Sequence, residues 1–232
     1  MILPCLFSVD QLDGQGQIYP TERYLKIGDS TTWASPEYDH QAWAYWATAQ
    51  YVGNFWQRFV ITIDSNQVDF EHPGLHIISQ GSYEVFWDGE KIGENGKVGK
   101  DKSEEIPGLF TSNILLPKEL IKPGKHIVAF RVSNHHAPNA RIGTWNNFFL
   151  EEFKAERESL LKLTAKIFVL AGIFLMAGLY YFFLYFLRGG AGVGKIFSLL
   201  CFLFFALVVM EYYKFYELYQ YHFHHTRLSV IL

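Results

Sequence analysis

Residues 134–146, NHHAPNARIGTWN, carry side chains well suited to hold a small ligand. Amide, imidazole and guanidinium groups can bind hydroxyls, while a tryptophan face packs against the apolar C–H patches of a sugar ring. Trp87 ends another β-forming run beside a turn and can add a second aromatic face. A solvated loop packed on the following helix is an equally weighted alternative. The ligand-site hypothesis names Asn134, His135, Arg141, Trp145 and Trp87.

Metal chemistry has weaker support. Asp29, Glu37 and Asp39 lie within eleven residues, and carboxylate oxygens are the ligands that Ca²⁺ prefers. No EF-hand pattern accompanies them, and such residues more often cap turns. His135 and His136 are adjacent rather than at the spacing of zinc ligands. We predict no cofactor and no resident metal, and we keep the three carboxylates as weak calcium candidates.

A further set of titratable groups lies near the C-terminal end, where His222, His224 and His225 stand in an aromatic stretch. Imidazoles change charge near neutral pH and also bind metals, so this set could sense pH or hold an ion. The sequence favours a simpler interpretation, in which the rings pack at a membrane–water interface among tyrosines and phenylalanines.

Catalysis and nucleic-acid binding have little support. Glu104 and Glu105 are neighbours, so their side chains point apart in an extended segment. The glycine-rich residues 188–195, RGGAGVGK, lack the Ser or Thr that a phosphate-binding loop needs, because Ile196 stands there. The net charge is -3 and no basic block stands out. We predict that this chain is not an enzyme and has no nucleic-acid partner.

The segment around which the chain is organised is residues 167–187, which contain no charge. As a helix this segment extends about 31 Å, enough to cross the core of a bilayer. The charged residues 151–166 lack helix breakers and predict a connecting helix that enters the membrane continuously. We predict a second span over residues 195–213 and the start of a third at residue 228, and so a fragment of a longer multi-pass protein in contact with lipid.

Residues 18–150 predict an all-β domain. Residues 55–64, FWQRFVITID, alternate between two sides of a strand, and Asp88-Gly89 is a strong hairpin signal. Short strands separated by such turns indicate a β-sandwich or jelly roll. Residues 1–17 are a leader or linker, and two interpretations stay open for their apolar start: a signal-peptide remnant, or an uncleaved start with no targeting role.

Four segments of this β domain resemble the galactose-binding-like jelly roll that serves as the sugar-binding domain of β-galactosidase-type glycoside hydrolases. In that family the hairpin reads Val-Asn-Gly, where this chain has Trp87, Asp88 and Gly89. The resemblance implies a jelly-roll fold and a carbohydrate as one kind of ligand. In order, the segments are GDSTTWASPEYDHQAW (28–43), YVGNFWQRFVI (51–61), YEVFWDGEKIGENG (83–96) and LIKPGKHIVAFRVSN (120–134).

The order of jelly roll, helix and spans resembles the bacterial seven-transmembrane receptors with diverse intracellular signalling modules. The resemblance rests on YYFFLYFLR (residues 180–188), a short basic loop and an apolar run that opens with Phe197. It implies a multi-pass protein of the bacterial inner membrane with an extracytoplasmic (periplasmic) sensor domain that binds a small ligand. A kinase, phosphatase or cyclase effector would then lie beyond residue 232, and a homodimer is left open.

Two other classes of protein stay open. Basic residues flank the first span on both sides, so the distribution of Lys and Arg weakly opposes an outside N-terminus. The chain could be a membrane-tethered carbohydrate-binding accessory protein without signalling. It could also be a subunit of a membrane enzyme or transporter in which the sandwich is purely structural.

Overall fold

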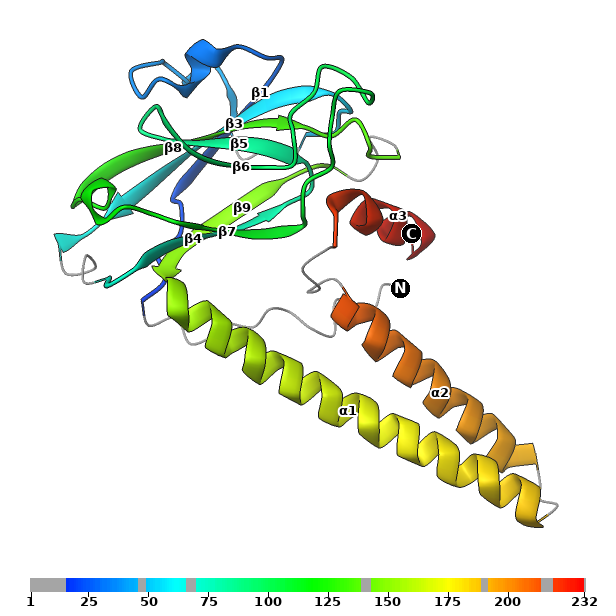
Figure 1. Cartoon of the computed structure of the whole chain (residues 1–232). Coiled ribbons are helices and arrows are strands. Elements are labelled where there is room, and N and C mark those ends of the chain that lie inside the picture. The colour runs from blue at the N-terminus through cyan, green and yellow to red at the C-terminus, as the bar shows by residue number, and fades with distance from the viewer. Residues whose placement is uncertain are drawn as a thin grey trace. The chain divides into compact units, whose positions relative to one another are not determined.

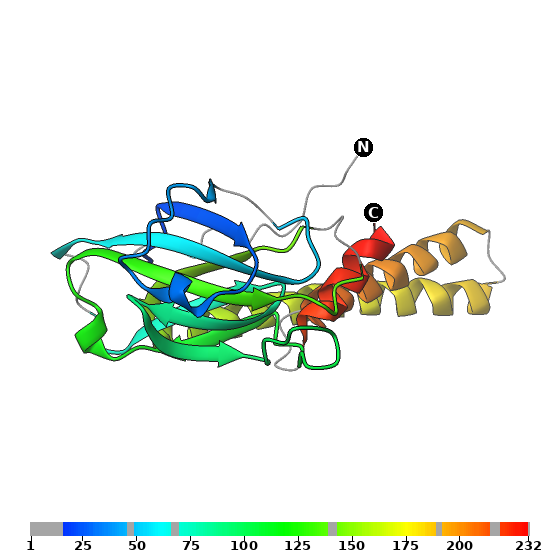
Figure 2. The same ribbon diagram turned by 90° about the horizontal axis from the view of Figure 1, so that it is seen from above.

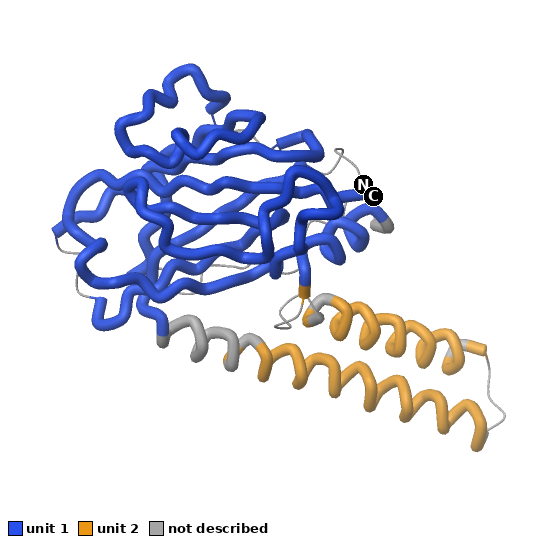
Figure 3. Tube along the Cα trace, turned by 45° about the horizontal axis from the view of Figure 1, so that its top comes forward, with its two compact units in different colours: residues 1–156, 220–232 blue, residues 157–219 orange. Residues whose placement is uncertain are grey.

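The structure is a computed structural model of the 232-residue chain. It describes residues 16–45, 49–65, 70–138, 143–188, 192–213 and 219–231. Two compact units divide the chain: Met1–Glu156 together with Gln220–Leu232, and Arg157–Tyr219 (Figure 3). Each unit is described by itself.

The first unit contains a sandwich of two antiparallel sheets (Figures 1 and 2), which confirms the predicted β-sandwich. The smaller sheet has the order β7-β4-β9 and consists of β4 (Pro73–Ser79), β7 (Thr111–Leu115) and β9 (Asn146–Glu152). The larger sheet has the order β2-β1-β3-β8-β5-β6. Its strands are β1 (Glu22–Ile27), β2 (Ala44–Tyr45), β3 (Asn54–Ile63), β5 (Ser82–Trp87), β6 (Glu90–Asn95) and β8 (Gly124–Ser133).

Strand β3 is buried on both faces, although its sequence alternates. Phe55, Phe59 and Ile61 lie in the main core of the sandwich. On the opposite face Trp56 belongs to a second apolar cluster with Ala34, Trp43 and Ala129. The segment that includes the short helix η1 (Thr31–Ala34) therefore covers the outer face of the larger sheet.

A buried arginine holds this covering segment in place. The guanidinium of Arg58, on β3, donates hydrogen bonds to the carbonyl oxygens of Trp33 at 2.6 Å and Ser35 at 2.7 Å. The Arg58 side chain is fully buried, and its burial lowers the pKa of the guanidinium. Carbonyl dipoles rather than a carboxylate thus satisfy the charge.

The Asp-Gly pair forms the expected tight turn between β5 and β6. Asp88 has φ 46° and Gly89 has φ 90°, the left-handed conformations that a type I′ hairpin turn requires at both central positions. The carboxylate of Asp88 also accepts hydrogen bonds from the ring of His126 at 2.6 Å and from the Ile127 N–H at 2.8 Å. The turn is therefore tied to the neighbouring strand β8.

Three helices follow the last strand: α1 (Phe153–Arg188), α2 (Gly192–Tyr213) and α3 (Tyr221–Ile231). Helix α1 begins directly after β9 and includes Thr164–Leu187, the one segment of the described residues that is long and apolar enough to cross a membrane. In α2 the apolar part, Gly194–Met210, is shorter. Within the second unit α1 and α2 pair side by side (Figure 1), and Ser198 donates a hydrogen bond to the Gly178 carbonyl at 2.9 Å.

Candidate functional site

Helix α3 packs against the sandwich, and the residues at its start hydrogen-bond to the segment that precedes β7. Gln220 pairs with Leu109 in an isolated antiparallel bridge, and the Tyr221 N–H donates to the Gly108 carbonyl at 3.0 Å. One turn further on, the ring of His224 stacks on Phe110 with centroids 4.1 Å apart. The contact therefore combines backbone pairing with ring packing.

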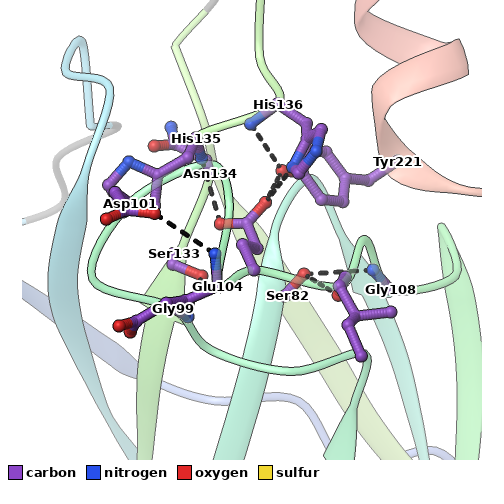
Figure 4. A network of polar contacts seen from close by, with 12 residues as sticks. Ser82, Gly99, Asp101, Glu104, Gly108, Ser133, Asn134, His135, His136 and Tyr221 are labelled. Atoms are coloured by element: carbon purple, nitrogen blue, oxygen red, sulfur yellow. Dashed lines mark hydrogen bonds and ion pairs between the residues drawn. The ribbon is translucent and has the colours of Figure 1, made fainter.

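A buried carboxylate lies at the centre of this contact (Figure 4). This carboxylate is that of Glu105, whose side chain is completely buried. Figure 4 shows His135, His136 and Tyr221, which belong to the same polar network. One of the Glu105 oxygens accepts hydrogen bonds from the Tyr221 hydroxyl and from Nδ1–H of His136, the latter at 3.0 Å. The other accepts the His135 N–H at 3.0 Å. Burial raises the pKa of Glu105, but hydrogen bonds from Ser133, Tyr221, His136 and His135 outweigh it and hold the pKa below its usual value.

Tyr221 connects helix α3 to this carboxylate. Its side chain is fully buried, and its hydroxyl also accepts the His136 N–H at 3.1 Å. Burial, followed by the charge of Glu105, raises the pKa of Tyr221 far above its usual value. The phenol therefore stays protonated and acts as a permanent donor to Glu105.

In the loop that carries most of the predicted ligand residues, the described residues Asn134 and His135 join parts of this unit. Asn134 is 1% exposed; its amide oxygen accepts the Gly53 N–H at 2.7 Å, and its NH₂ group donates to Thr144 Oγ1 at 2.6 Å. His135 contacts Asn54 Oδ1 through Nε2 at 3.0 Å. These two side chains are thus engaged with the protein itself.

The other predicted ligand residues are dispersed. Trp87 is 1% exposed and belongs to the main core, so its ring offers no face to a ligand in this structure. Trp145 is half-buried, and its carbonyl oxygen accepts the Gln80 N–H at 3.3 Å. Arg141 lies outside the described residues. A ligand role for the set stays a prediction.

Two of the three calcium candidates, Asp29 and Asp39, have other partners. Asp29 receives two hydrogen bonds from Arg131, at 2.6 and 2.7 Å, and these bonds lower the pKa of its carboxyl. Asp39 accepts the N–H of Gln41 at 2.9 Å. In the part of the chain that the structure describes, neither belongs to a cluster of three metal-ligating groups.

One such cluster exists among the described residues, formed by Glu71, His72 and Glu152. The Glu152 carboxylate accepts the backbone N–H groups of Glu71 at 2.8 Å and His72 at 2.9 Å. These hydrogen bonds account for the cluster without an ion, because they tie the end of β9 to the start of β4.

The partnership between Glu105 and Tyr221 was not predicted from the sequence. The two residues are 116 positions apart, and neither stands in a recognisable motif. The one available signal was the aromatic, histidine-rich character of residues 219–225, which fits an interface of any kind. Only the fold brings this segment to the sandwich.

Fold and site define a β-sandwich protein whose chain continues into apolar helices. No protein-family model and no curated protein matches the sequence. Among solved structures, a glycosyl hydrolase family 2 member from Bacteroides cellulosilyticus is similar over 59% of this chain and 20% of its own, at 11% identity and a TM-score of 0.45. A β-glucuronidase 2 from Bacteroides uniformis is similar over 56% and 17%, at 17% identity and a TM-score of 0.42.

A β-glycosidase from Bacteroides vulgatus is similar over 58% of this chain and 20% of its own, at 16% identity and a TM-score of 0.41. The chain thus spans about a fifth of the length of the structures it matches.

Proposed function

We propose that this chain is the sensory part of a membrane signalling receptor of the bacterial inner membrane. In this proposal the sandwich lies on the extracytoplasmic side, binds a small ligand such as a carbohydrate, and acts through the helices on an effector beyond residue 232. The observation that carries the proposal is the docking of α3 on the sandwich.

Docking constrains the path of the chain. Two segments that pack together lie on the same side of a membrane, so the chain between Glu152 and Gln220 crosses it an even number of times. Thr164–Leu187 is long enough for one crossing. The apolar part of α2, Gly194–Met210, would then supply the return, with flanking residues extending it to spanning length. We therefore propose two spans between the sandwich and α3.

The same path gives the sandwich two connections to the helices. At the first, β9 passes into α1 without a loop, and the Phe153 N–H donates to the His72 carbonyl at 2.9 Å. At the second, α2 is followed within a few residues by the docked α3. A ligand with different affinities for two arrangements of the sandwich would therefore bias the helices through both connections.

A second candidate function is favoured by the internal contacts of Asn134, His135 and Trp87. If the loops of the sandwich serve only to hold α3, the sandwich is a structural part of a membrane enzyme or transporter. Ligand binding distinguishes the two candidates, because a structural module needs no ligand.

The test uses the full chain, purified in detergent, and a panel of D-galactose, D-glucuronic acid and D-mannose. A ligand at a hundred times its Kd stabilises the folded state by about 2.7 kcal/mol, which thermal unfolding detects readily. The receptor proposal expects a saturable increase in Tm with at least one sugar or another small molecule.

A second test is made in cells. Removal of residues 18–150 in frame should change the transcript profile in the same way as deletion of the whole gene. A transcript profile equal to that of the parent would contradict the receptor role.

A further inference from the structure

His225 is the most deeply buried of the three histidines of α3, and it is held in its neutral form. The residue is fully buried. Its Nε2 lies 3.2 Å from the carbonyl oxygen of Gln80, which can only accept, so Nε2 carries the proton. Its Nδ1 has no hydrogen-bond partner. A second proton on this ring would therefore create a buried cation with one unsatisfied donor.

His222 lies one turn earlier, beside groups that also oppose a positive charge. Its ring centroid is 6.3 Å from that of His136, and burial, His136 and Lys102 together lower its pKa. For His225 the pKa is lowered by burial, and the hydrogen bond to Gln80 offsets this only in part. Docking thus disfavours the protonated form of both rings.

The charged and titratable groups of the sandwich around these rings come from two segments. The segment between β6 and β7 supplies Glu105 and Lys102, and the turn after β8 supplies His136. The nearest carboxylate of this set, Glu105, is already saturated by its donors and is bonded to Tyr221 and His136 rather than to His222 or His225. Among the described residues no carboxylate contributes to the pKa of either ring.

We propose that α3 is a proton-sensitive arm, which docks on the sandwich at neutral and higher pH and leaves it when His225 and His222 become protonated. This inference stands on the docking geometry and goes beyond the proposed function, since it adds the proton as an input whatever the sandwich binds.

The direction of the pH dependence of docking follows from the pKa of each imidazole in the released and in the docked arm. In the released arm the pKa lies near 6.5, and in the docked arm it is lower. Docking is therefore at full strength above about pH 6.5, and the docking constant falls by up to about tenfold per pH unit for each histidine below it. The fall ends once the pH reaches the lowered pKa of the docked ring.

The test measures the arm directly in the full chain in lipid nanodiscs. Spin labels are placed at the exposed positions Thr226 and Lys125 through T226C and K125C, with Cys5 and Cys201 replaced by serine. Electron–electron double resonance at about pH 8 should give one narrow distance, and at about pH 5.5 a second, broad population should appear. Identical distance distributions at the two pH values would overturn the proposal.

Two variants test whether the pH-dependent release of α3 depends on His225 and His222. H225Q keeps a donor for the Gln80 carbonyl but cannot be protonated, so the arm should stay docked further into the acid range. The matched control H72Q makes the same change at an exposed histidine of the sandwich and should leave the response unchanged. If α3 of H225Q is not docked at about pH 8, H222Q is the deciding variant. In H222Q the docking constant should fall less steeply with pH, by up to about tenfold less per pH unit. A full response in H222Q, or in a docked H225Q, contradicts the proposal.

Discussion

Glu105 and Arg58 are buried charged side chains, and hydrogen bonds hold both of them, although Nε of Arg58 has no hydrogen-bond partner among the described residues. Hydroxyl, imidazole and backbone donors surround the carboxylate, while carbonyl oxygens surround the guanidinium. A buried charge is costly to leave unsatisfied, so each becomes a point at which one segment is fixed to the sandwich. Glu105 fixes α3, and Arg58 fixes the segment around η1.

Removal of the Tyr221 hydroxyl should loosen α3 without removing its ring. Y221F leaves Glu105 buried with one donor fewer, which should weaken docking by about 1–3 kcal/mol. Hydrogen exchange of the α3 amides should become faster. The matched control is Y19F, whose hydroxyl bonds Gln17 on an exposed surface and should not affect α3. Equal exchange in Y221F and the parent would show that the hydrogen bond contributes nothing to docking.

Replacement of Arg58 should destabilise the protein more than replacement of an exposed basic residue. R58M keeps much of the volume but leaves the carbonyl oxygens of Trp33 and Ser35 buried without a donor, so we expect a loss of about 2–5 kcal/mol. Thermal unfolding of the full chain in detergent measures it. K91M, which removes a lysine from an exposed pairing with Glu84 and Glu94, should change Tm little. A small effect of R58M would show that water reaches these carbonyls.

At the scale of single residues, the sequence shows which chemical groups are present but not which partners they have in the fold. Trp87 was proposed as a ligand residue, yet it is 1% exposed and lies in the main core. Asn134 was proposed as a ligand residue because a polar side chain in a loop is commonly free, yet the fold surrounds it with backbone groups that need partners. Such a role depends on contacts between distant segments, which no local pattern carries.

At the scale of elements, the sequence predicted those features that depend only on neighbouring residues. The Asp88-Gly89 turn and the alternating pattern of β3 were found from the sequence, because turn conformation and side-chain period are properties of neighbouring residues. Helix α3 is different. The sequence predicted an interfacial stretch around residues 222–225 and the start of a span at residue 228. In the structure these residues belong to one helix that packs on the sandwich through tertiary contacts.

A disulfide can test the position of α3 directly. Leu109 and Gln220 are opposed in an antiparallel bridge, where Cα atoms lie about 4.5–5.5 Å apart, within the range that a disulfide needs. L109C/Q220C, with Cys5 and Cys201 replaced, should therefore form a cross-link under mild oxidation, visible in peptide mass spectra. L115C/Q220C is the control, because Leu115 lies at the other end of β7 and should not pair. Equal yields from both pairs would contradict the docked position.

At the scale of the molecule, the sequence predicted an all-β domain and a helix apolar and long enough to cross a membrane, because each has a strong signature in hydropathy or period. Composition could not reveal that the chain returns to the sandwich after α2. That return makes residues 220–231 part of the same compact unit as residues 16–156. The proposed topology therefore rests on a contact rather than on the charges beside the spans.

Cysteine accessibility tests this topology most directly. Single cysteines at the exposed positions Ser103, Gly192 and Thr226, in a background without Cys5 and Cys201, are exposed to a membrane-impermeant thiol reagent in whole cells permeable only at any outer membrane. We predict labelling at Ser103 and Thr226 and protection at Gly192 until the cells are lysed. Labelling of Ser103 and Thr226 from opposite sides, or of all three from one side, would contradict the docked, twice-crossing chain. Protection of both Ser103 and Thr226 with labelling at Gly192 would keep the docking but place the sandwich in the cytoplasm, against the receptor proposal.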